Sequence, residues 1–181
     1  MKYTAILTAA TLVLTSNLSF AGNKRPQCHS ITGNFAISVD NNCPILTAPE
    51  RNYWYQESSF LFESGVPNTC FKGELTASLA GLEIKGVSYS AMTLNSFPSI
   101  DNMMAFTAIS LVEVTTKEGW PLGKLITKDT GIQDNTTYNA NEILSISDGS
   151  SYFKNASGTI QIDGPSLLGS SEVSGSICLK R

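Results

Sequence analysis

Four cysteines are the residues with the clearest chemical consequence in this sequence: Cys28, Cys43, Cys70 and Cys178. An even number of cysteines in an exported chain is typical of disulfides, and no Cys-x-x-Cys pair indicates a redox motif. Three pairings are possible. In a closed barrel with an even number of strands, the first and last strands pair antiparallel. We therefore favour Cys28–Cys178, which leaves Cys43–Cys70.

Few residues offer nucleophilic, metal or phosphate chemistry. The single histidine, His29, lies beside a cysteine that we expect in a disulfide, and no Gly-x-Ser-x-Gly motif is present, which argues against a serine hydrolase. A zinc site would have to combine His29 with widely spaced cysteines. The stretch from Gly164 to Gly169 lacks the spacing and the lysine of a phosphate-binding loop. We therefore predict no catalytic residue, no cofactor and no metal.

Carboxylates are the remaining source of acid–base chemistry. Glu57 and Glu63 share a strand parity, and Glu113 ends an apolar run. A carboxyl group that points into a barrel lumen would have a raised pKa and could act as an acid or a base. The alternative, which we favour for each of them, is a solvated outer face or a strand end.

The densest aromatic group is Tyr53-Trp54-Tyr55. Exposed aromatic side chains in a loop can stack on a carbohydrate or contact a partner protein. The alternative, which we favour, is that this segment folds over a barrel mouth as part of the core. Tyr53, Trp54 and Tyr55 are nevertheless the candidate ligand- or partner-binding residues of the sequence.

Residues 1–21 have the pattern of a secretory signal peptide. Lys2 supplies the positive start, an apolar run of about ten residues follows, and Ser19 and Ala21 are the small residues that a signal peptidase reads. The run is too short to cross about 30 Å of hydrocarbon as an anchor. We predict cleavage after Ala21, a secreted or periplasmic product, and no stable membrane insertion.

The formal net charge is -3, and basic residues are scattered singly along the chain. Nucleic-acid binding needs a concentrated basic surface that neutralises phosphates, so this class of partner is excluded. The length suits one domain, which we place at residues 22–181.

Apolar and polar residues alternate through most of residues 22–181, which is the period of a strand with one buried face. Turn formers such as Asp129-Thr130-Gly131 and Asp148-Gly149 separate these segments. About eight or nine short strands indicate an all-β sandwich or an up-and-down barrel, and glycines inside several strands favour the barrel. The predicted strands are 31–39, 58–63, 71–79, 82–94, 103–115, 123–128, 142–147, 157–163 and 172–179.

The second half contains a glycine turn at Gly149, then Phe153, then Ala156, and then Ser-Gly-Thr around Gly158 opening the next strand. This pattern resembles that of the allene oxide cyclase barrel group and the related dirigent proteins. The resemblance implies an antiparallel eight-stranded barrel, allene oxide cyclase-like or lipocalin-like, with a lumen able to hold a small apolar molecule. The four positions also have structural interpretations: a positive-φ turn at Gly149, a plug at Phe153, and tight strand closure at Ala156 and Gly158.

These observations lead to three hypotheses. The first is an exported, non-catalytic β-barrel that binds a small apolar ligand or a partner surface. The second is an isomerase or cyclase that acts on a lipid-like substrate, which requires a carboxylate or another polar group inside the lumen. The third is a secreted interaction module that contacts a protein or carbohydrate partner through Tyr53–Tyr55.

Overall fold

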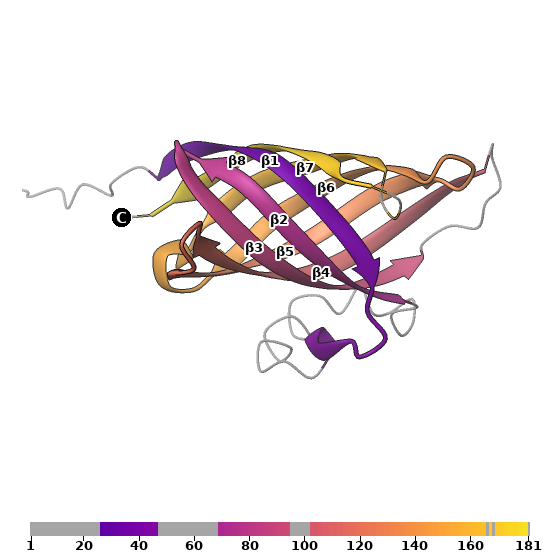
Figure 1. Cartoon of the computed structure of the whole chain (residues 1–181), viewed down its shortest axis with the longest axis horizontal. Coiled ribbons are helices and arrows are strands. Elements are labelled where there is room, and N and C mark those ends of the chain that lie inside the picture. The colour runs from indigo at the N-terminus through magenta and orange to yellow at the C-terminus, as the bar shows by residue number, and fades with distance from the viewer. Residues whose placement is uncertain (1–25, 47–68, 95–101, 166, 168, 181) are drawn as a thin grey trace, which may run out of the picture.

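The structure is a computed structural model, and it describes residues 26–46, 69–94, 102–165, 167 and 169–180. Strands β1 to β8 form one closed barrel in which each strand pairs antiparallel with the next and β8 returns to β1 (Figure 1). The predicted all-β barrel is therefore confirmed. The strands are β1 (Gln27–Val39), β2 (Thr69–Leu79), β3 (Leu82–Leu94), β4 (Met103–Thr116), β5 (Pro121–Asp134), β6 (Asn139–Gly149), β7 (Ser157–Pro165) and β8 (Ser171–Leu179).

The barrel closes because one side-chain parity of each strand is apolar and faces the lumen. In β2, Leu75, Ala77 and Leu79 are buried, whereas the intervening Glu74 and Thr76 are exposed. The same period places the inward side chains of the other strands in one continuous core that includes Ile31, Ile84, Val112, Leu125, Ile160, Val173 and Ile177. Burial of these apolar side chains is the main force that stabilises the barrel.

Both predicted disulfides are present. Cys28 and Cys178 are register partners on β1 and β8, so their bond fastens the seam where the barrel closes. The Cys43–Cys70 bond ties the segment after β1 to the start of β2. Two disulfides in one small domain are typical of an oxidising compartment. Within the residues that the structure describes, no helix is long and apolar enough to cross a membrane.

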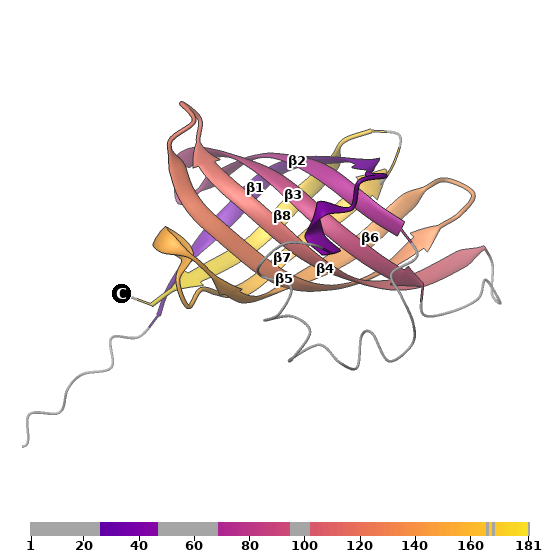
Figure 2. The same cartoon turned by 90° about the horizontal axis from the view of Figure 1, so that it is seen from below.

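A short 3-10 helix, η1 (Pro44–Leu46), lies across the outside of the barrel wall against β3 (Figure 2). Its Ile45 is buried in an outer cluster with Cys70, Ile109, Leu111 and other apolar residues. This cluster explains why β4 is apolar on both parities: one of its faces points into the lumen and the other lies beneath η1.

The end of the barrel at which β1 begins and β8 ends is plugged. A second 3-10 helix, η2 (Ser151–Phe153), lies between β6 and β7, and its Phe153 is 0% exposed within the core. Phe153 is thus the predicted plug. Gly158 has a φ of +134°, and a Cβ there would lie 2.2 Å from the Ser176 carbonyl oxygen, so it permits the expected close strand approach.

The positive-φ turn predicted at Gly149 is wrong. Gly149 does not adopt a positive φ, whereas Ser151 and Asn155 in the same connection do. The reason for a glycine is instead space, because a Cβ at Gly149 would lie 2.4 Å from the Phe153 carbonyl oxygen. This glycine lets η2 pack against the barrel rim.

The turn predicted at Asp129-Thr130-Gly131 is also wrong. These residues lie inside β5, which extends to Asp134 rather than ending at Lys128. Strand pairing on both sides overrides the turn preference of these residues here, because β4 and β6 each pair with this part of β5. As part of β5, Asp129 and Gly131 have the parity that faces the lumen.

Candidate functional site

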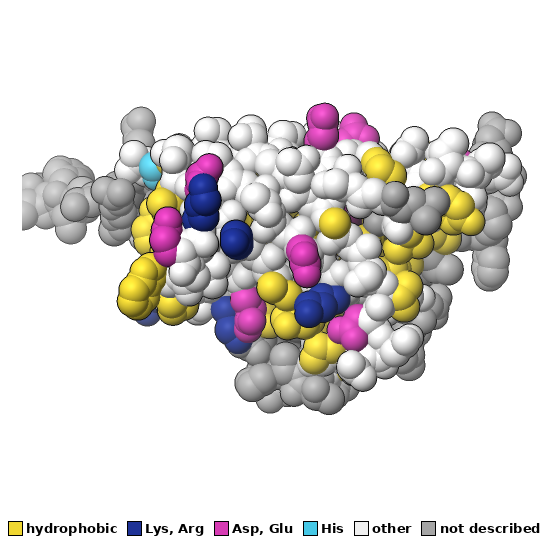
Figure 3. Space-filling view, in the orientation of Figure 1, with side chains coloured by type: hydrophobic (Ala, Val, Ile, Leu, Met, Phe, Trp, Pro, Cys, Tyr) yellow, Lys and Arg dark blue, Asp and Glu magenta, His cyan; other side chains and the backbone are white. Residues whose placement is uncertain are grey.

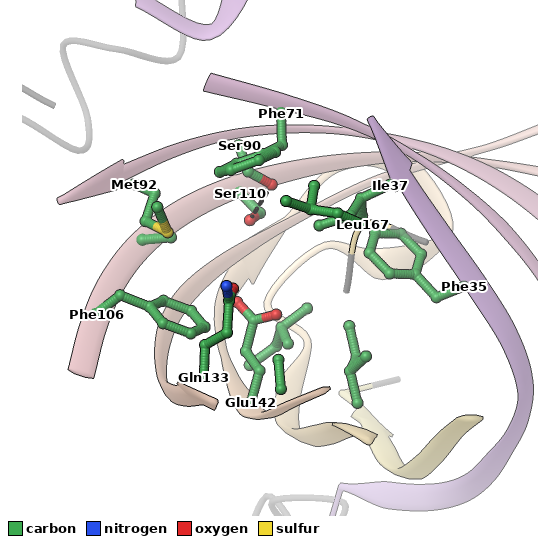
Figure 4. A pocket seen from close by; sticks show the side chains of 14 residues that line it. Phe35, Ile37, Phe71, Ser90, Met92, Phe106, Ser110, Gln133, Glu142 and Leu167 are labelled. Atoms are coloured by element: carbon green, nitrogen blue, oxygen red, sulfur yellow. Dashed lines mark hydrogen bonds between the residues drawn. The ribbon is translucent and has the colours of Figure 1, made fainter. Parts of the chain in front are cut away.

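A cavity of about 50 Å³ lies in the lumen toward the end of the barrel opposite the Phe153 plug; we call it the outer cavity. Aromatic and aliphatic side chains form most of its wall, and four polar side chains project among them (Figure 4). The described lining residues are Phe35, Ile37, Phe71, Ser90, Met92, Phe106, Ala108, Ser110, Gln133, Ala140, Glu142, Leu144, Ile162 and Leu167.

Polar side chains on four consecutive strands form a belt across one side of the lumen. We call Ser90, Ser110, Asp129 and Glu142, from β3, β4, β5 and β6 respectively, the polar belt. Ser90 pairs in register with Ser110, Asp129 pairs with Leu144, and Glu142 pairs with Gly131. The two acidic residues are therefore diagonal neighbours on adjacent strands, where side chains are within reach of one another.

Hydrogen bonds connect three of the four residues of the polar belt. The Ser90 and Ser110 hydroxyls lie 2.7 Å apart, and Ser110 Oγ donates a hydrogen bond to Asp129 Oδ2. Ser90 Oγ can in turn donate to Ser110 Oγ, which completes a chain of donors that ends on the carboxyl group. Such a chain favours the charged form of Asp129.

Burial works against that charge. Asp129 is 1% exposed, and its Oδ1 has no hydrogen-bond partner. Burial raises the pKa of Asp129 to about 7, although the hydrogen bond from the Ser110 hydroxyl opposes the shift. A carboxyl group of this kind can hold or release a proton close to neutral pH.

Glu142 is the acidic residue that reaches the outer cavity. Its side chain is partly exposed and lines the cavity together with Gln133 (Figure 4). Burial, and secondarily the negative charge of Asp129, raise the pKa of Glu142 well above its ordinary value. Because the two carboxyl groups titrate as a pair, they favour retaining a proton between them.

Glycines make room for the aromatic rings of the cavity wall. A Cβ at Gly131 would lie 2.3 Å from Phe106 Cζ, and a Cβ at Gly73 would lie 2.2 Å from Phe35 Cζ. Gly131 is also the register partner of Glu142, so the Phe106 ring lies over β5 beside that carboxyl group. A ring and a carboxyl group thus share one wall of the cavity.

A second, smaller cavity lies deeper in the barrel. This inner cavity measures about 30 Å³, has an almost wholly apolar lining, and shares Phe35, Leu144 and Ile162 with the outer cavity. One polar group in its wall, the Ser88 hydroxyl, is buried without a hydrogen-bond partner. Along the barrel axis, the cavity wall therefore changes from one with four polar side chains to one with a single polar side chain.

Of the acidic and aromatic residues considered from sequence, only Glu113 lies in the described ranges, and it does not line this cavity. Glu113 points outward from β4, where its carboxylate lies 3.2 Å from the Lys124 ammonium, as the favoured outer-face alternative requires. Glu57, Glu63 and the Tyr53–Tyr55 group lie outside the described residues, as do the predicted signal peptide and strand 58–63. In the described ranges, no group of three His, Cys, Asp or Glu side chains is arranged to hold a metal ion.

The sequence contained a signal for Asp129 that the turn interpretation concealed. Leu125, Thr127, Asp129, Gly131 and Gln133 share one parity, and the buried Leu125 fixes that parity as inward. Extending the strand by its alternation, rather than ending it at the first Asp-Thr-Gly, would have placed the carboxyl group in the lumen.

No protein-family model, curated protein or solved structure matches this chain. The resemblance to the allene oxide cyclase and dirigent barrels stays a prediction.

Replacing Ser110 with alanine tests the hydrogen bond to Asp129. At pH 8, we expect S110A to lower the free energy of unfolding by about 1–3 kcal/mol, because the substitution leaves a buried carboxylate without its donor. The matched control, S90A, keeps the Ser110–Asp129 bond and should cost less. Urea unfolding of both variants measures the difference, and equal losses would contradict the direction of this chain.

Proposed function

We propose that this protein is an exported binding protein for a small, mostly apolar ligand, and that the polar belt binds the ligand's one polar group. The observation that carries the proposal is a pair of carboxyl groups set into a mostly apolar lumen beside a cavity with an aromatic wall. Ligand sites in proteins combine an apolar wall with a few placed polar groups in this way.

The unfavourable free energy of burying Asp129 and Glu142 supports a role of these residues in ligand binding. Burying an unpaired carboxyl group destabilises a fold, and an apolar side chain at position 129 would fill the same space without that cost. Polar groups retained at such a cost cluster at functional sites. A binding role explains both acidic residues together.

The size of the cavities restricts the ligand. Sites for drug-sized molecules measure about 300–1,000 Å³, whereas the outer cavity measures about 50 Å³. An apolar cavity that binds benzene measures about 150 Å³, so the ligand is small, and even a single aromatic ring needs side chains such as Met92 to move. Met is suited to such movement because its side chain is unbranched and flexible.

Export is supported by two independent features. The first 21 residues have the pattern of a signal peptide, and both cysteine pairs form disulfides. Charged side chains of both signs are interspersed on the face shown in Figure 3, without a continuous basic patch. A small-molecule carrier or receptor outside the cytoplasm fits these properties better than a nucleic-acid-binding protein.

Titration with 2-phenylethanol tests the proposed function. We expect the alcohol to bind and to raise the unfolding temperature, because its ring suits the phenylalanine wall and its hydroxyl suits the polar belt. Ala140 lines the outer cavity, so A140F should weaken binding by at least about tenfold. The control I143F adds the same bulk on the exposed face of the same strand. Binding that A140F leaves intact, or no binding, would refute a lumen site.

A second candidate function is acid–base catalysis on the bound ligand, as in an isomerase or cyclase. It is favoured by one observation: Glu142 lines the cavity and has a raised pKa, as a general acid or base at neutral pH requires. Hydrogen–deuterium exchange at the α-carbon of a small ketone such as phenylacetone reports this activity by NMR. Exchange that is accelerated by the wild type and lost in E142Q would support catalysis, whereas equal rates would oppose it.

A further inference from the structure

We propose that the outer cavity is a site for a protonated amine, so that the ligand is a small ammonium ion with an aromatic or aliphatic tail. This inference rests on the proposed function and names the chemical class of its ligand. Three features support it: the negative charge of the polar belt, the aromatic wall of the outer cavity, and the inner cavity that continues the outer one.

The charge inside the lumen has one sign near the outer cavity. Its described lining includes the Glu142 carboxyl group but no Lys, Arg or His. On the strands that flank the acidic pair, Glu113, Lys124 and Lys128 have outward parity. His29 has inward parity but lies at the far, plugged end, next to the Cys28–Cys178 seam. The pair Asp129 and Glu142 therefore lacks a facing cation among the described strand residues.

The aromatic wall suits a cation. Phe35, Phe71 and Phe106 surround the cavity, and Phe106 lies on the same wall as Glu142 (Figure 4). The face of an aromatic ring attracts an ammonium ion, and this attraction grows when both are removed from water. Rings together with a carboxylate bind an ammonium group from several sides, whereas they would repel a carboxylate ligand.

Asp129 provides a second, independent indication. Its Oδ1 is an acceptor buried in the lumen without a partner, while its Oδ2 accepts from Ser110. An ammonium group has three donors and can bond to Glu142 while its positive charge also compensates Asp129. The same charge lowers the pKa of both carboxyl groups, so binding displaces a proton from the pair to the solvent.

The inner cavity explains why the ligand should have a tail. It continues the outer cavity behind Phe35, Leu144 and Ile162, and its lining is apolar apart from Ser88. A primary amine with one aromatic ring or a short alkyl chain places its charge at the polar belt and its apolar part deeper in the barrel. Burial of that part adds affinity in proportion to its apolar area.

Isothermal titration with 2-phenylethylamine and 2-phenylethanol tests the inference, because the two probes share a shape and differ in the ammonium group. At pH 7.5, we expect the disulfide-bonded protein to bind the amine at least about tenfold more tightly than the alcohol. Phenylacetate, the anionic counterpart, should bind more weakly than either. The affinity for the amine should rise from pH 5.5 to pH 7.5, and titrations in two buffers of different ionisation enthalpy should show proton release.

Two variants test whether the preference for the amine depends on the Glu142 carboxyl group or on any carboxyl group nearby. E142Q should reduce the preference for the amine to within about threefold, while its affinity for the alcohol stays close to that of the wild type. E113Q removes an outward carboxylate from the neighbouring strand and should leave the preference unchanged. The circular dichroism spectrum of each variant checks that the barrel is intact.

The outcomes distinguish the inference from the proposed function. If the alcohol binds as tightly as the amine and A140F weakens both, the ammonium class is wrong and the lumen site stands. If neither probe binds the wild type, the proposed function fails as well. An amine preference that persists in E142Q would overturn the assignment to the acidic pair.

Discussion

Removing the Cys28–Cys178 disulfide is expected to lower the free energy of unfolding by about 5 kcal/mol. The two cysteines are 150 residues apart, so their bond restricts almost the whole unfolded chain. The Cys43–Cys70 bond spans 27 residues, and the same chain-entropy relation gives about 3–4 kcal/mol for its loss. The seam disulfide should therefore be the more important of the two.

Urea unfolding of the double variants C28A/C178A and C43A/C70A measures both effects. Alanine is suitable at the second pair because Cys70 lies in the apolar outer cluster with Ile45. Loss of that bond also frees η1, which the near-ultraviolet spectrum should report as a local change. A larger loss of stability in C43A/C70A than in C28A/C178A would show that local packing outside the barrel, rather than closure of the chain ends, dominates.

The sequence predicted the barrel from alternation and from the glycines inside several strands. Alternation identified β3 as residues 82–94, which are its observed bounds, because a half-buried strand has a two-residue period. The Cys28–Cys178 pairing was inferred from the closure of the barrel, and the observed pairing of β1 with β8 agrees with it because a disulfide has a short reach.

The candidate site could not be predicted in the same way, because residue type and strand parity gave opposite answers. Asp, Thr and Gly favour turns, and at positions 129–131 this preference concealed a strand that its neighbours on both sides hold in place. Asp129 was therefore missed, and so was its position diagonal to Glu142 on the next strand. Glu113 shows the same limit, since only the register reveals that it points outward to Lys124.

The stability of the protein is expected to fall as the pH rises from 5 to 8. The pKa of Asp129 is about 7 in the folded protein and 3.8 in a model peptide, so protonated Asp129 is favoured by folding. Its stabilising contribution is fully present below pH 3.8 and is lost as the pH rises through about 7. At about 1.4 kcal/mol per pKa unit, the total is about 4 kcal/mol, of which about 2–3 kcal/mol lies between pH 5 and pH 8.

The variant D129N isolates this contribution. Asparagine keeps the shape of the side chain and an oxygen that accepts from Ser110, but it never becomes charged. D129N should therefore be more stable than the wild type at pH 8, lose that advantage near pH 5, and show a flatter dependence between them. E142Q should flatten the curve in part, because it removes the charge that opposes ionisation of Asp129.

Thermal and urea unfolding at several pH values measure these curves, with E113Q as the control for an outward carboxylate whose neighbour is Lys124. A wild-type curve that D129N leaves unchanged would show that Asp129 is ionised in the folded protein throughout this range. The polar belt would then hold a full negative charge without a bound cation. An ammonium ligand should compensate the negative charge of Asp129 and Glu142. It should therefore raise the free energy of unfolding of the wild type at pH 8 and have little effect on D129N/E142Q.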